Sequence, residues 1–465
     1  MEKFFKIKER GSTVKTEVFA GITTFMAMAY ILMVNAGMFA DLPEVSYNAV
    51  YIATAISAVV GTLLIGLLSN LPLAQASGMG LNAFFVYTVC FGFGLTYANA
   101  LTLVLLDGLV FIILTATGLR KKIFDAIPKC VKAAIPAGIG LFIAFLGYQN
   151  SGIVTNDDAT LVTLASFNVF KGNAEWRSIM PMLVTLIVII TIAVLSIRKV
   201  KGAVLWGILG GSVLYYLLGL TIPGFYNGFA DNLTLNPFTA FADFGRESFF
   251  KVFTQGFDYS SYLESNSVSS LVILIATTAL AFCLVDMFDT MGTLYGACSQ
   301  GNMLTKDGEV PNMNKAMLAD ALATTVGSIC GTSTVTTFVE SSAGIAEGGR
   351  TGLAAIVSAA MFFIAMFLSP IAALIPGCAT AAALIYVGIL MIKCVKDIDW
   401  NDISVAAPAF VTIAMMPFTY NISYGIAFGL LTYVCIKLFT GKAKEINVGT
   451  LVITALFIFM FMLTH

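Results

Sequence analysis

The chain has 465 residues, of which 58% are hydrophobic and only 11% are charged. Soluble domains carry roughly 25% charged residues, so this composition excludes a chain made of soluble domains. The net charge of −1 argues against nucleic acid as a partner, because such proteins carry a strong positive excess.

Apolar segments that are long enough to cross a lipid bilayer recur along almost the whole chain. A membrane-spanning helix needs about 20 predominantly apolar residues. Fourteen such spans are predicted, at 17–38, 46–69, 71–92, 97–118, 131–149, 179–197, 202–220, 270–297, 314–331, 333–346, 351–374, 378–395, 403–419 and 421–439. A further apolar segment, 447–464, has no counterpart in the first half. The sequence therefore predicts an all-α polytopic membrane protein.

The loops between the spans differ sharply in positive charge. If the N-terminus lies inside, the inner loops hold all but four of the 25 Lys and Arg residues, which indicates fourteen crossings. The exceptions are Lys171, Arg177, Arg246 and Lys251. The charged start of the chain leads directly into a span, so no cleavable signal peptide is expected. We predict a multi-pass protein of the cytoplasmic (inner) membrane with its N-terminus inside.

The polar stretch 221–268 falls on the outside and divides the chain into two halves of seven spans each. An odd number of spans gives the halves opposite orientations, as in transporters built from inverted repeats. The third span of each half is interrupted: 70–83 contains Pro and Gly, and 332–344 is rich in Ser and Thr. Both are expected to be extended backbone followed by a short helix, with Asn82 and Glu340 in matching places.

The eighth span places two carboxylates on one helical stripe, formed by Thr278, Phe282, Asp286, Asp289 and Thr293. A carboxylate within lipid costs about 2.5–3.5 kcal/mol on insertion scales, so these groups must face a cavity, pair with donors or carry a proton. No basic residue lies within a neighbouring span, which suggests that at least one acid is protonated part of the time. The alternative is a polar patch for helix packing, since Gly292 and Gly296 form a GxxxG pattern.

The candidate site combines backbone N–H groups at the short helices with the acids Asp286 and Glu340 and the amide of Asn82. The acids would repel an inorganic anion, and a bare metal ion would need several oxygen ligands and no N–H donors. A planar heterocycle with adjacent N–H and C=O groups suits this mixture. Several aromatic residues could stack on such a ring or serve only packing: Phe282, Phe338, Phe84 and Tyr30.

Other acids within or near the spans are weaker candidates. Asp320 could cap a helix or orient its neighbours, and Asp107 could pair with a hydroxyl group. Glu17 is interpreted as a first-turn acid near the interface. The segment 347–352 is expected to form a tight inner turn. The only histidine is His465, and the eight cysteines form no CxxC pair, so neither a metal site nor a cofactor is predicted.

Four motifs together resemble one known family. They are the segments 16–25, 75–83, 286–293 and 340–352. Over about residues 12–440 the chain resembles the second nucleobase–cation symporter family, within the nucleobase/ascorbate transporters, and in particular its azaguanine-type purine permeases. This resemblance implies a 7+7 inverted repeat with a core domain (spans 1–4 and 8–11), a gate domain (spans 5–7 and 12–14) and short antiparallel strands in spans 3 and 10.

The resemblance also implies proton-coupled uptake of purine bases and, in many members, a homodimer. Carried over by motif, Asn82, Asp286 and Glu340 are expected to contact the purine, and Asp289 to support the site or the coupling. Phe282, Phe338 and Ala83 are further candidates for substrate binding. The residues expected to serve proton coupling are Asp286, Asp289 and Glu340. Uracil-type relatives place a histidine in span 8, and this chain has none there, so their coupling scheme cannot be transferred.

Each expected domain is split between the two halves of the chain. The core would comprise 1–118 and 269–374, the gate would comprise 119–220 and 375–440, an extracellular loop region would cover 221–268, and an extra C-terminal segment would cover 441–465. A carboxylate accepts the N1–H and amino group of guanine well, which favours 6-oxopurines such as guanine and hypoxanthine, while adenine and xanthine stay open. Two rivals remain: an anion transporter (sulfate or bicarbonate type) of the same architecture, and a membrane enzyme, for which no nucleophile–base pair is found.

Overall fold

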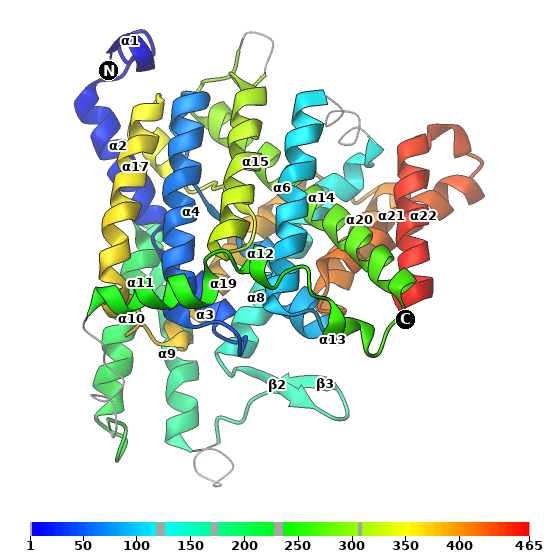
Figure 1. Ribbon diagram of the computed structural model, residues 1–465. Coiled ribbons are helices and arrows are strands. Elements are labelled where there is room, and N and C mark those ends of the chain that lie inside the picture. The colour runs from blue at the N-terminus through cyan, green and yellow to red at the C-terminus, as the bar shows by residue number, and fades with distance from the viewer. Residues whose placement is uncertain (1, 118–125, 169–174, 227–235, 306–308, 465) are drawn as a thin grey trace.

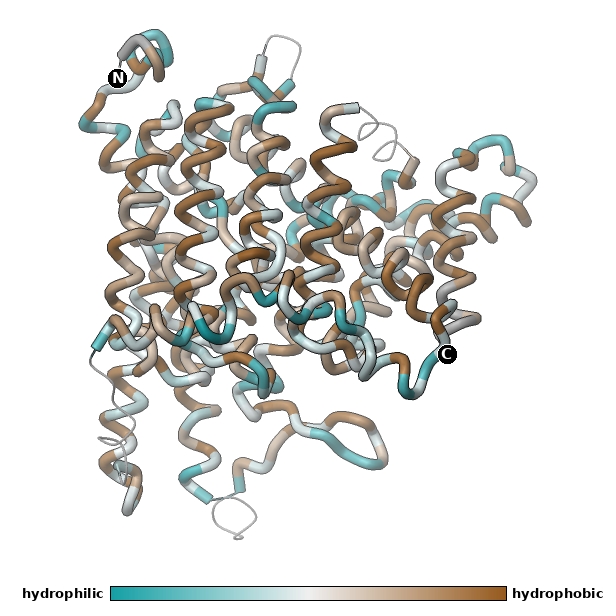
Figure 2. Tube along the Cα trace, viewed as in Figure 1, coloured by the Kyte–Doolittle hydropathy of each residue, from teal (hydrophilic) through white to brown (hydrophobic). Residues whose placement is uncertain are grey.

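The computed structural model describes residues 2–117, 126–168, 175–226, 236–305 and 309–464. Long helices run side by side between two ends, one marked by the N-terminal helix α1 (Glu2–Phe5) and the other by a hairpin of β2 (Val154–Asp157) and β3 (Leu161–Leu164) (Figure 1). Hydrophobic residues follow the helices, and hydrophilic residues collect at both ends (Figure 2). Within the described residues, nine helices are long and apolar enough to cross a membrane.

The first half of the chain contains seven spans in the predicted order. They are α2–α3 (Val14–Met28 and Tyr30–Phe39), α4 (Tyr47–Leu68), β1–α5–η1 (Gln75–Ser77, Met79–Ala83 and Phe84–Gly92), α6 (Tyr97–Thr117), α8 (Lys129–Asn150), α9 (Trp176–Ile197) and α10 (Ala203–Gly219). The third span is the interrupted one, as the sequence predicts. The expected domain boundary between residues 118 and 119 lies outside the described residues.

The second half repeats this order and adds one helix. Its spans are α14 (Val268–Gln300), α15 (Met313–Cys330), β4–α16 (Val335–Thr337 and Ser341–Ala346), α17 (Gly352–Ala365, followed by η3 at Met366–Leu368 and α18 at Ser369–Ala372), α19 (Gly377–Met391, followed by η4 at Ile392–Asp397), α20 (Ile403–Phe418) and α21 (Ile422–Phe439). After η5 (Ala443–Glu445), the extra helix α22 (Val448–Thr464) packs against α14 and α21. The predicted 7+7 architecture is confirmed.

The two interrupted spans meet at the strands β1 and β4. These strands pair antiparallel, with Gln75 opposite Thr337, Ala76 opposite Thr336 and Ser77 opposite Val335. β-branched residues such as Val and Thr favour extended backbone. Inside a membrane, such backbone must be covered by protein, and all three residues of each strand are buried. The short antiparallel strands expected in spans 3 and 10 are therefore present.

Helices of the two halves pack together in two groups. In the first group, α4 packs against α15 and α17, α6 against α15, and α2 against α17. In the second, α8 packs against α19 and α20, α20 against α21, and α9 against α10 and α19. The contact of α4 with α17 is close, because a Cβ added to Gly352 would lie 2.0 Å from the carbonyl oxygen of Gly66.

Other expectations about local structure need correction or refinement. The stretch 221–268 is partly helical: α11 (Pro237–Asp243), η2 (Phe244–Ser248), α12 (Lys251–Thr254) and α13 (Ser260–Leu263) form a band across the ends of α4 and α6 (Figure 1). Residues 227–235 of that stretch lie outside the described residues. The GxxxG interpretation of α14 is wrong, because an added Cβ at Gly292 or Gly296 would meet no atom of a described residue within 4 Å.

Candidate functional site

A cavity opens where the chain leaves β1 and β4. It encloses about 600 Å³ of space, part of it open to solvent. Its walls come from both halves of the chain, and α8 and α19 of the second packing group contribute to them. The lining residues are Tyr30, Met79, Gly80, Leu81, Ile139, Val285, Asp289, Thr293, Thr337, Phe338, Val339, Glu340, Val387, Leu390 and Met391.

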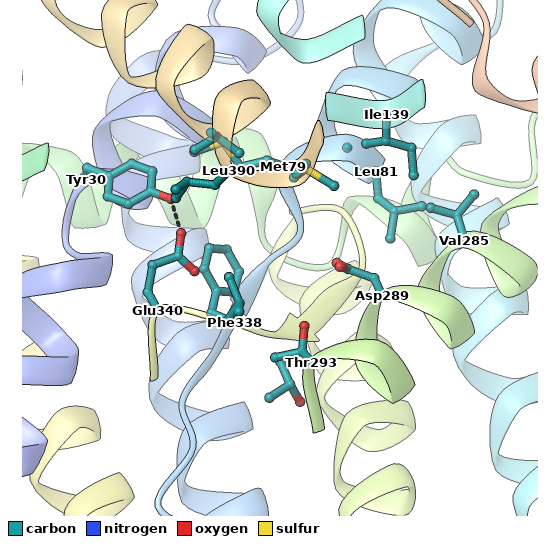
Figure 3. Close-up of a pocket in the computed structure, with 15 residues that line it drawn as sticks. Tyr30, Met79, Leu81, Ile139, Val285, Asp289, Thr293, Phe338, Glu340 and Leu390 are labelled. Carbon is teal, nitrogen blue, oxygen red and sulfur yellow. Dashed lines mark hydrogen bonds between the residues drawn. The ribbon is translucent and has the colours of Figure 1, made fainter. Parts of the chain in front are cut away.

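One side of the cavity is formed by Glu340 and Tyr30. Glu340 follows β4 and is the N-cap residue of α16, and its side chain is half-buried. The fully buried Tyr30, at the start of α3, donates a hydrogen bond from its hydroxyl to Oε1 of Glu340 at 2.7 Å (Figure 3). A hydrogen bond to an ionised acceptor is stronger than one between neutral groups, so Tyr30 fixes the carboxylate. The second oxygen, Oε2, stays available for a ligand.

The other polar side is formed by Asp289 and Thr293 of α14, across from Glu340 in Figure 3. The hydroxyl of Thr336 in β4 donates to Oδ2 of Asp289 at 3.1 Å. Thr293 follows Asp289 by one helical turn, so the two side chains lie on the same face of α14. Each carboxylate of the cavity is thus held through one oxygen by a hydroxyl from a different element.

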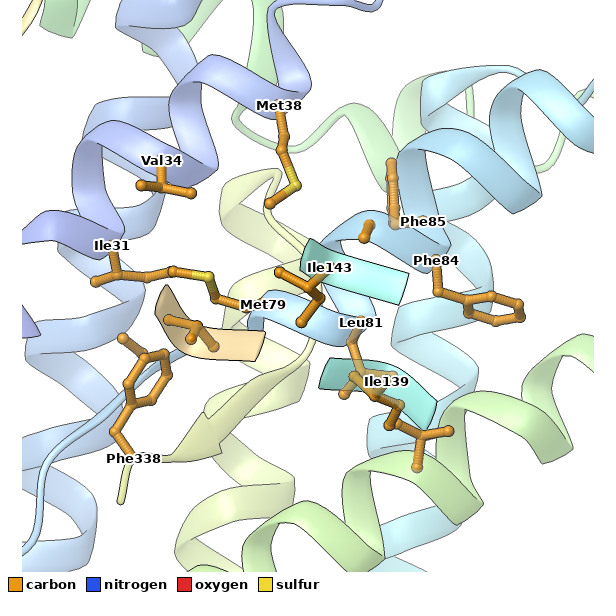
Figure 4. Close-up of a cluster of buried hydrophobic side chains, with 14 of the residues drawn as sticks. Ile31, Val34, Met38, Met79, Leu81, Phe84, Phe85, Ile139, Ile143 and Phe338 are labelled. Carbon is orange, nitrogen blue, oxygen red and sulfur yellow. The ribbon is translucent and has the colours of Figure 1, made fainter. Parts of the chain in front are cut away.

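Apolar side chains separate these two polar sides. Met79 and Leu81 of α5 and Phe338 pack in a cluster with residues of α3, η1 and α8 (Figure 4). Ile139 of α8 and Val387 of α19 close the cavity from the second packing group. This group approaches closely, since a Cβ added to Gly80 would lie 2.5 Å from Cγ2 of Ile139. The result is an apolar slot with a carboxylate at each of two sides.

The structure brings together three of the predicted site residues and leaves four outside the lining. Glu340, Asp289 and Phe338 line the cavity, whereas Asn82, Ala83, Asp286 and Phe282 do not. Asn82 is fully buried, where its Oδ1 accepts from the hydroxyl of Ser77 at 2.6 Å and its amide donates weakly to the Ser77 carbonyl. In this structure, Asn82 therefore braces β1.

The geometry of α14 explains why only part of the acidic stripe reaches the cavity. Successive residues of an α-helix are rotated by about 100°, so Asp286 points about 60° away from Asp289. Asp286 is fully buried and accepts a long hydrogen bond of 3.5 Å from the hydroxyl of Thr324. Phe282 is also fully buried, with its ring edge-to-face against Phe84 at 4.9 Å between centroids. The face that reaches the cavity is Val285, Asp289 and Thr293.

Asn82 and Glu340 do not occupy matching places, contrary to the expectation. Asn82 lies five residues beyond the end of β1, inside α5, whereas Glu340 lies three residues beyond the end of β4. The residue at the equivalent distance from β1 is Gly80, which does line the cavity. The sequence alone could not reveal this offset, because the ends of the two strands become clear only from their pairing.

A second cavity adjoins the first, shares Tyr30 and Glu340 with it and encloses about 1,080 Å³, its open part included. Its far wall lies in the loop between α9 and α10. There Lys201 forms an ion pair of 2.7 Å with Glu347, which follows α16. This second cavity leads from the site toward the end of the molecule predicted to lie inside, and we call it the vestibule.

Two of the weaker acidic candidates have structural partners. Oδ1 of the buried Asp320 accepts from Gln75 of β1 at 3.0 Å and from Thr290 at 2.8 Å, so it orients its neighbours, as one of the two interpretations of this residue expected. Glu17 lies in the first turn of α2, as expected, and it also has a structural role. Glu17 is fully buried and accepts from the backbone N–H groups of Arg350, Thr351 and Ala354, so it caps the start of α17.

Sequence reasoning missed the polar role of Tyr30, which it named only as a stacking candidate. It also missed the hydroxyl of Thr293 as part of the site, although the spacing of four from Asp289 was a usable signal. The lining from α8 and α19, at Ile139 and Val387, carries no sequence signal, because these residues resemble any apolar residue of a span.

The donor set of the cavity restricts what it can bind. No Lys, Arg or His lines it among the described residues, so its carboxylates have no cationic partner there. The described residues also contain no cluster of three or more His, Cys, Asp and Glu side chains that could hold a metal ion. The cavity therefore offers carboxylate acceptors and hydroxyl groups at two sides of an apolar slot, a combination that suits a flat, polar-edged molecule.

Comparison with known proteins places these features in context. The model of the Permease family (Xan_ur_permease) matches residues 15–428. A guanine/hypoxanthine permease of Bacillus subtilis is 38% identical over 97% of this chain and 98% of its own length. An adenine permease of Escherichia coli is 34% identical over 98% of this chain and 95% of its own length. Among solved structures, the transmembrane domain of a cyanobacterium bicarbonate transporter matches with a TM-score of 0.61 at 16% identity, covering 88% of this chain and 97% of that domain.

Proposed function

Because this chain belongs to the nucleobase/ascorbate transporter family, whose model covers most of its length, we propose that it imports purine nucleobases by proton-coupled alternating access. The observation that carries the proposal is the slot with Glu340 and Asp289 at its two polar sides. The relatives described as guanine/hypoxanthine and adenine permeases, similar over nearly the full chain, support the same substrate class.

The edges of a purine base complement this slot. Its flat rings fit between apolar walls such as Phe338 and Leu81, while its polar edges reach the two sides. Oε2 of Glu340 can accept one N–H group, and the Tyr30 oxygen, which already donates its own proton, can accept a second. Adjacent N–H groups occur on the N1 and amino edge of guanine, so a 6-oxopurine fits this side better than adenine. Asp286 and Asn82 lie outside the lining, and we propose that they hold the lining residues in position.

The proton is proposed to travel on the carboxyl groups Asp289, Glu340 and Asp286. A carboxylate that is removed from water and lacks a cationic partner is stabilised by protonation. Binding a proton together with the neutral base would therefore remove the charge penalty while the cavity is closed. The proton would leave when the cavity opens to the inside.

The two packing groups correspond to the proposed core and gate domains. The core holds β1, β4 and α14, and the gate contributes Ile139 of α8 and Val387 of α19 to the cavity. Movement of one group against the other would expose the slot alternately at the two membrane faces. We propose that this occurs in the cytoplasmic membrane, with the N-terminus and the vestibule inside. Assembly as a homodimer is an additional proposal from the family resemblance.

An anion transporter of the same architecture is the main competing function. The bicarbonate transporter domain shares the fold at 16% identity, which supports the architecture alone. Two carboxylates with no basic residue in the described lining repel an anion, so the chemistry of this cavity favours a neutral heterocycle.

Transport by the purified protein in liposomes tests the proposal. Labelled guanine or hypoxanthine should accumulate when the outside is more acidic than the inside, and a protonophore should abolish the accumulation. Asp289→Asn should still allow downhill exchange of the base while losing accumulation driven by the pH gradient. Accumulation that does not depend on the pH gradient would contradict proton coupling. Uptake of sulfate or bicarbonate without any purine uptake would instead support the anion transporter.

A further inference from the structure

The hydroxyl of Thr293 differs from the other threonine hydroxyls of α14 because it lines the cavity. The buried hydroxyl of Thr278 also lacks a partner among the described residues, but Thr278 lies outside the lining. Membrane helices usually satisfy a threonine hydroxyl within the protein, as Thr277 does by donating to the carbonyl of Ile273 at 2.8 Å. Thr290 donates to Asp320 at 2.8 Å. Thr293 makes no side-chain hydrogen bond to any described residue, and it lines the cavity with 8% of its surface exposed. Its donor is thus left for a ligand.

Thr293 and Asp289 together present one donor and one acceptor. Oδ2 of Asp289 is occupied by Thr336, which leaves Oδ1 as an acceptor. The Thr293 hydroxyl, one turn further along α14, can donate. A ligand edge that matches this pair carries an N–H donor near an acceptor, for example a ring nitrogen with a lone pair.

The two edges of a purine fit the two sides of the cavity in one orientation. When the N1 and amino edge faces Glu340 and Tyr30, the imidazole edge points to the opposite side, where Figure 3 shows Asp289 and Thr293. That edge carries N9–H and the lone pair of N7. Building on the proposed function, we propose that Thr293 is a specificity-determining residue that donates to N7 while Asp289 accepts from N9–H.

The test pairs a change in the protein with a change in the ligand. The two competitors are hypoxanthine and 7-deazahypoxanthine, in which a C–H group replaces N7. Each is tested for inhibition of labelled guanine uptake by the wild type and by Thr293→Val, in which the side chain keeps nearly the same shape. Wild type should bind the 7-deaza compound roughly tenfold more weakly, as expected for one lost hydrogen bond. Thr293→Val should bind hypoxanthine roughly tenfold more weakly and make no further distinction between the two compounds.

Matched controls separate this contact from general effects. Thr277→Val removes a hydroxyl from the same helix away from the cavity and should retain the wild-type discrimination. Thr293→Ser should restore discrimination, because it restores the donor. For 3-deazahypoxanthine, any loss of affinity relative to hypoxanthine should be the same in the wild type and in Thr293→Val.

Three outcomes would overturn the inference. The first is a wild-type protein that does not distinguish hypoxanthine from its 7-deaza analogue, a result that requires no variant to fold. The second is that the loss of affinity caused by Thr293→Val and the loss caused by replacing N7 multiply when the two changes are combined, as they would for independent effects. The third is that Thr293→Val changes the relative affinity for 3-deazahypoxanthine but not that for the 7-deaza compound. Failure of the proposed function is distinguishable, because the wild type would then transport none of these bases.

Discussion

At the scale of single residues, each carboxylate of the cavity is fixed by a hydrogen bond to one of its oxygens. Tyr30 holds one oxygen of Glu340, and Thr336 holds one oxygen of Asp289. Each donor comes from a different element than the acid it binds, so the acids are fixed without being neutralised by a cation. A ligand with N–H groups can complete their hydrogen bonding.

Tyr30→Phe tests whether this fixation matters. The variant retains the aromatic ring and removes the donor to Glu340. The concentration of guanine that gives half-maximal uptake should rise roughly tenfold, because hydrogen bonds to charged groups contribute about 1.5–3 kcal/mol. The amount of protein in the membrane should stay unchanged. Tyr47→Phe is the matched control, since that hydroxyl donates to the carbonyl of Ala372 away from the cavity. Equal effects of both changes would contradict a special role for Tyr30.

The acidic residues of the site could be predicted from the sequence, but the directions in which their side chains point could not. A carboxylate within a span is conspicuous, so Asp286, Asp289 and Glu340 could all be predicted. Which of them reaches the cavity depends on a rotation of about 60° along α14, and hydrophobic periodicity does not resolve this in a helix buried on several sides. Tyr30 could not be assigned as the partner of Glu340, because the two are 310 positions apart in the chain.

At the scale of elements, the paired strands are held in place by side chains of α14 and α15. Asp289 accepts from Thr336, Asp320 and Thr337 both accept from Gln75, and Thr324 bonds the backbone of Val335. The interrupted pattern of the two spans allowed these strands to be predicted. Their register could not be predicted, because segments of three residues carry too little pattern to specify it.

Glu17 provides a prediction at the same scale, about how α17 is anchored. Glu17→Gln replaces a buried acceptor of three backbone N–H groups with an amide whose NH₂ group would face those donors. The free energy of unfolding should fall by about 1–3 kcal/mol, as for a lost helix cap with an unsatisfied group. Thermal unfolding in detergent measures this effect, and the midpoint should decrease by several degrees.

Glu9→Gln is the control for Glu17, because Glu9 is exposed and forms an ion pair with the exposed Lys6. Such surface pairs contribute little to stability, so its unfolding midpoint should match the wild type. If Glu17→Gln also unfolds at the wild-type temperature, the three hydrogen bonds do not anchor α17 as described.

At the scale of the whole molecule, the two packing groups touch at the vestibule through Lys201 and Glu347. The first belongs to the loop after α9 and the second follows α16, so their ion pair links the proposed gate to the proposed core. With side chains 51% and 33% exposed, the pair contributes little to stability. A small difference between two conformations can nevertheless change how often each is populated.

Exchanging the charges tests this link. Lys201→Glu and Glu347→Lys should each change the transport rate about two- to fivefold, because each places like charges together and shifts the equilibrium between conformations by less than about 1 kcal/mol. The double exchange should return the rate toward the wild type, since it restores an opposite pair. Initial uptake rates in liposomes measure the effect. Independent effects that simply multiply in the double variant would show that the pair is not coupled.

Much of the overall architecture could be predicted from the distribution of polar residues. The polar stretch 221–268 divides the chain into two sets of seven spans, and the resemblance to a known family implies the inverted repeat. The packing of α22 against α14 and α21 could not be predicted, because an apolar helix outside the repeat has no symmetric partner to guide its placement. The positions of the short helices from α11 to α13 could not be predicted either, because they depend on contacts with α4, α6 and α14.

The central claim is that the slot between Glu340 and Asp289 binds a purine base. Calorimetric titration of the purified protein with guanine tests it most directly, because binding is measured without transport. Wild type and the exposed control Glu264→Gln should bind guanine alike, whereas Glu340→Gln should bind it roughly a hundredfold more weakly. Equal guanine affinity in Glu340→Gln and wild type, with both proteins folded, would contradict the account.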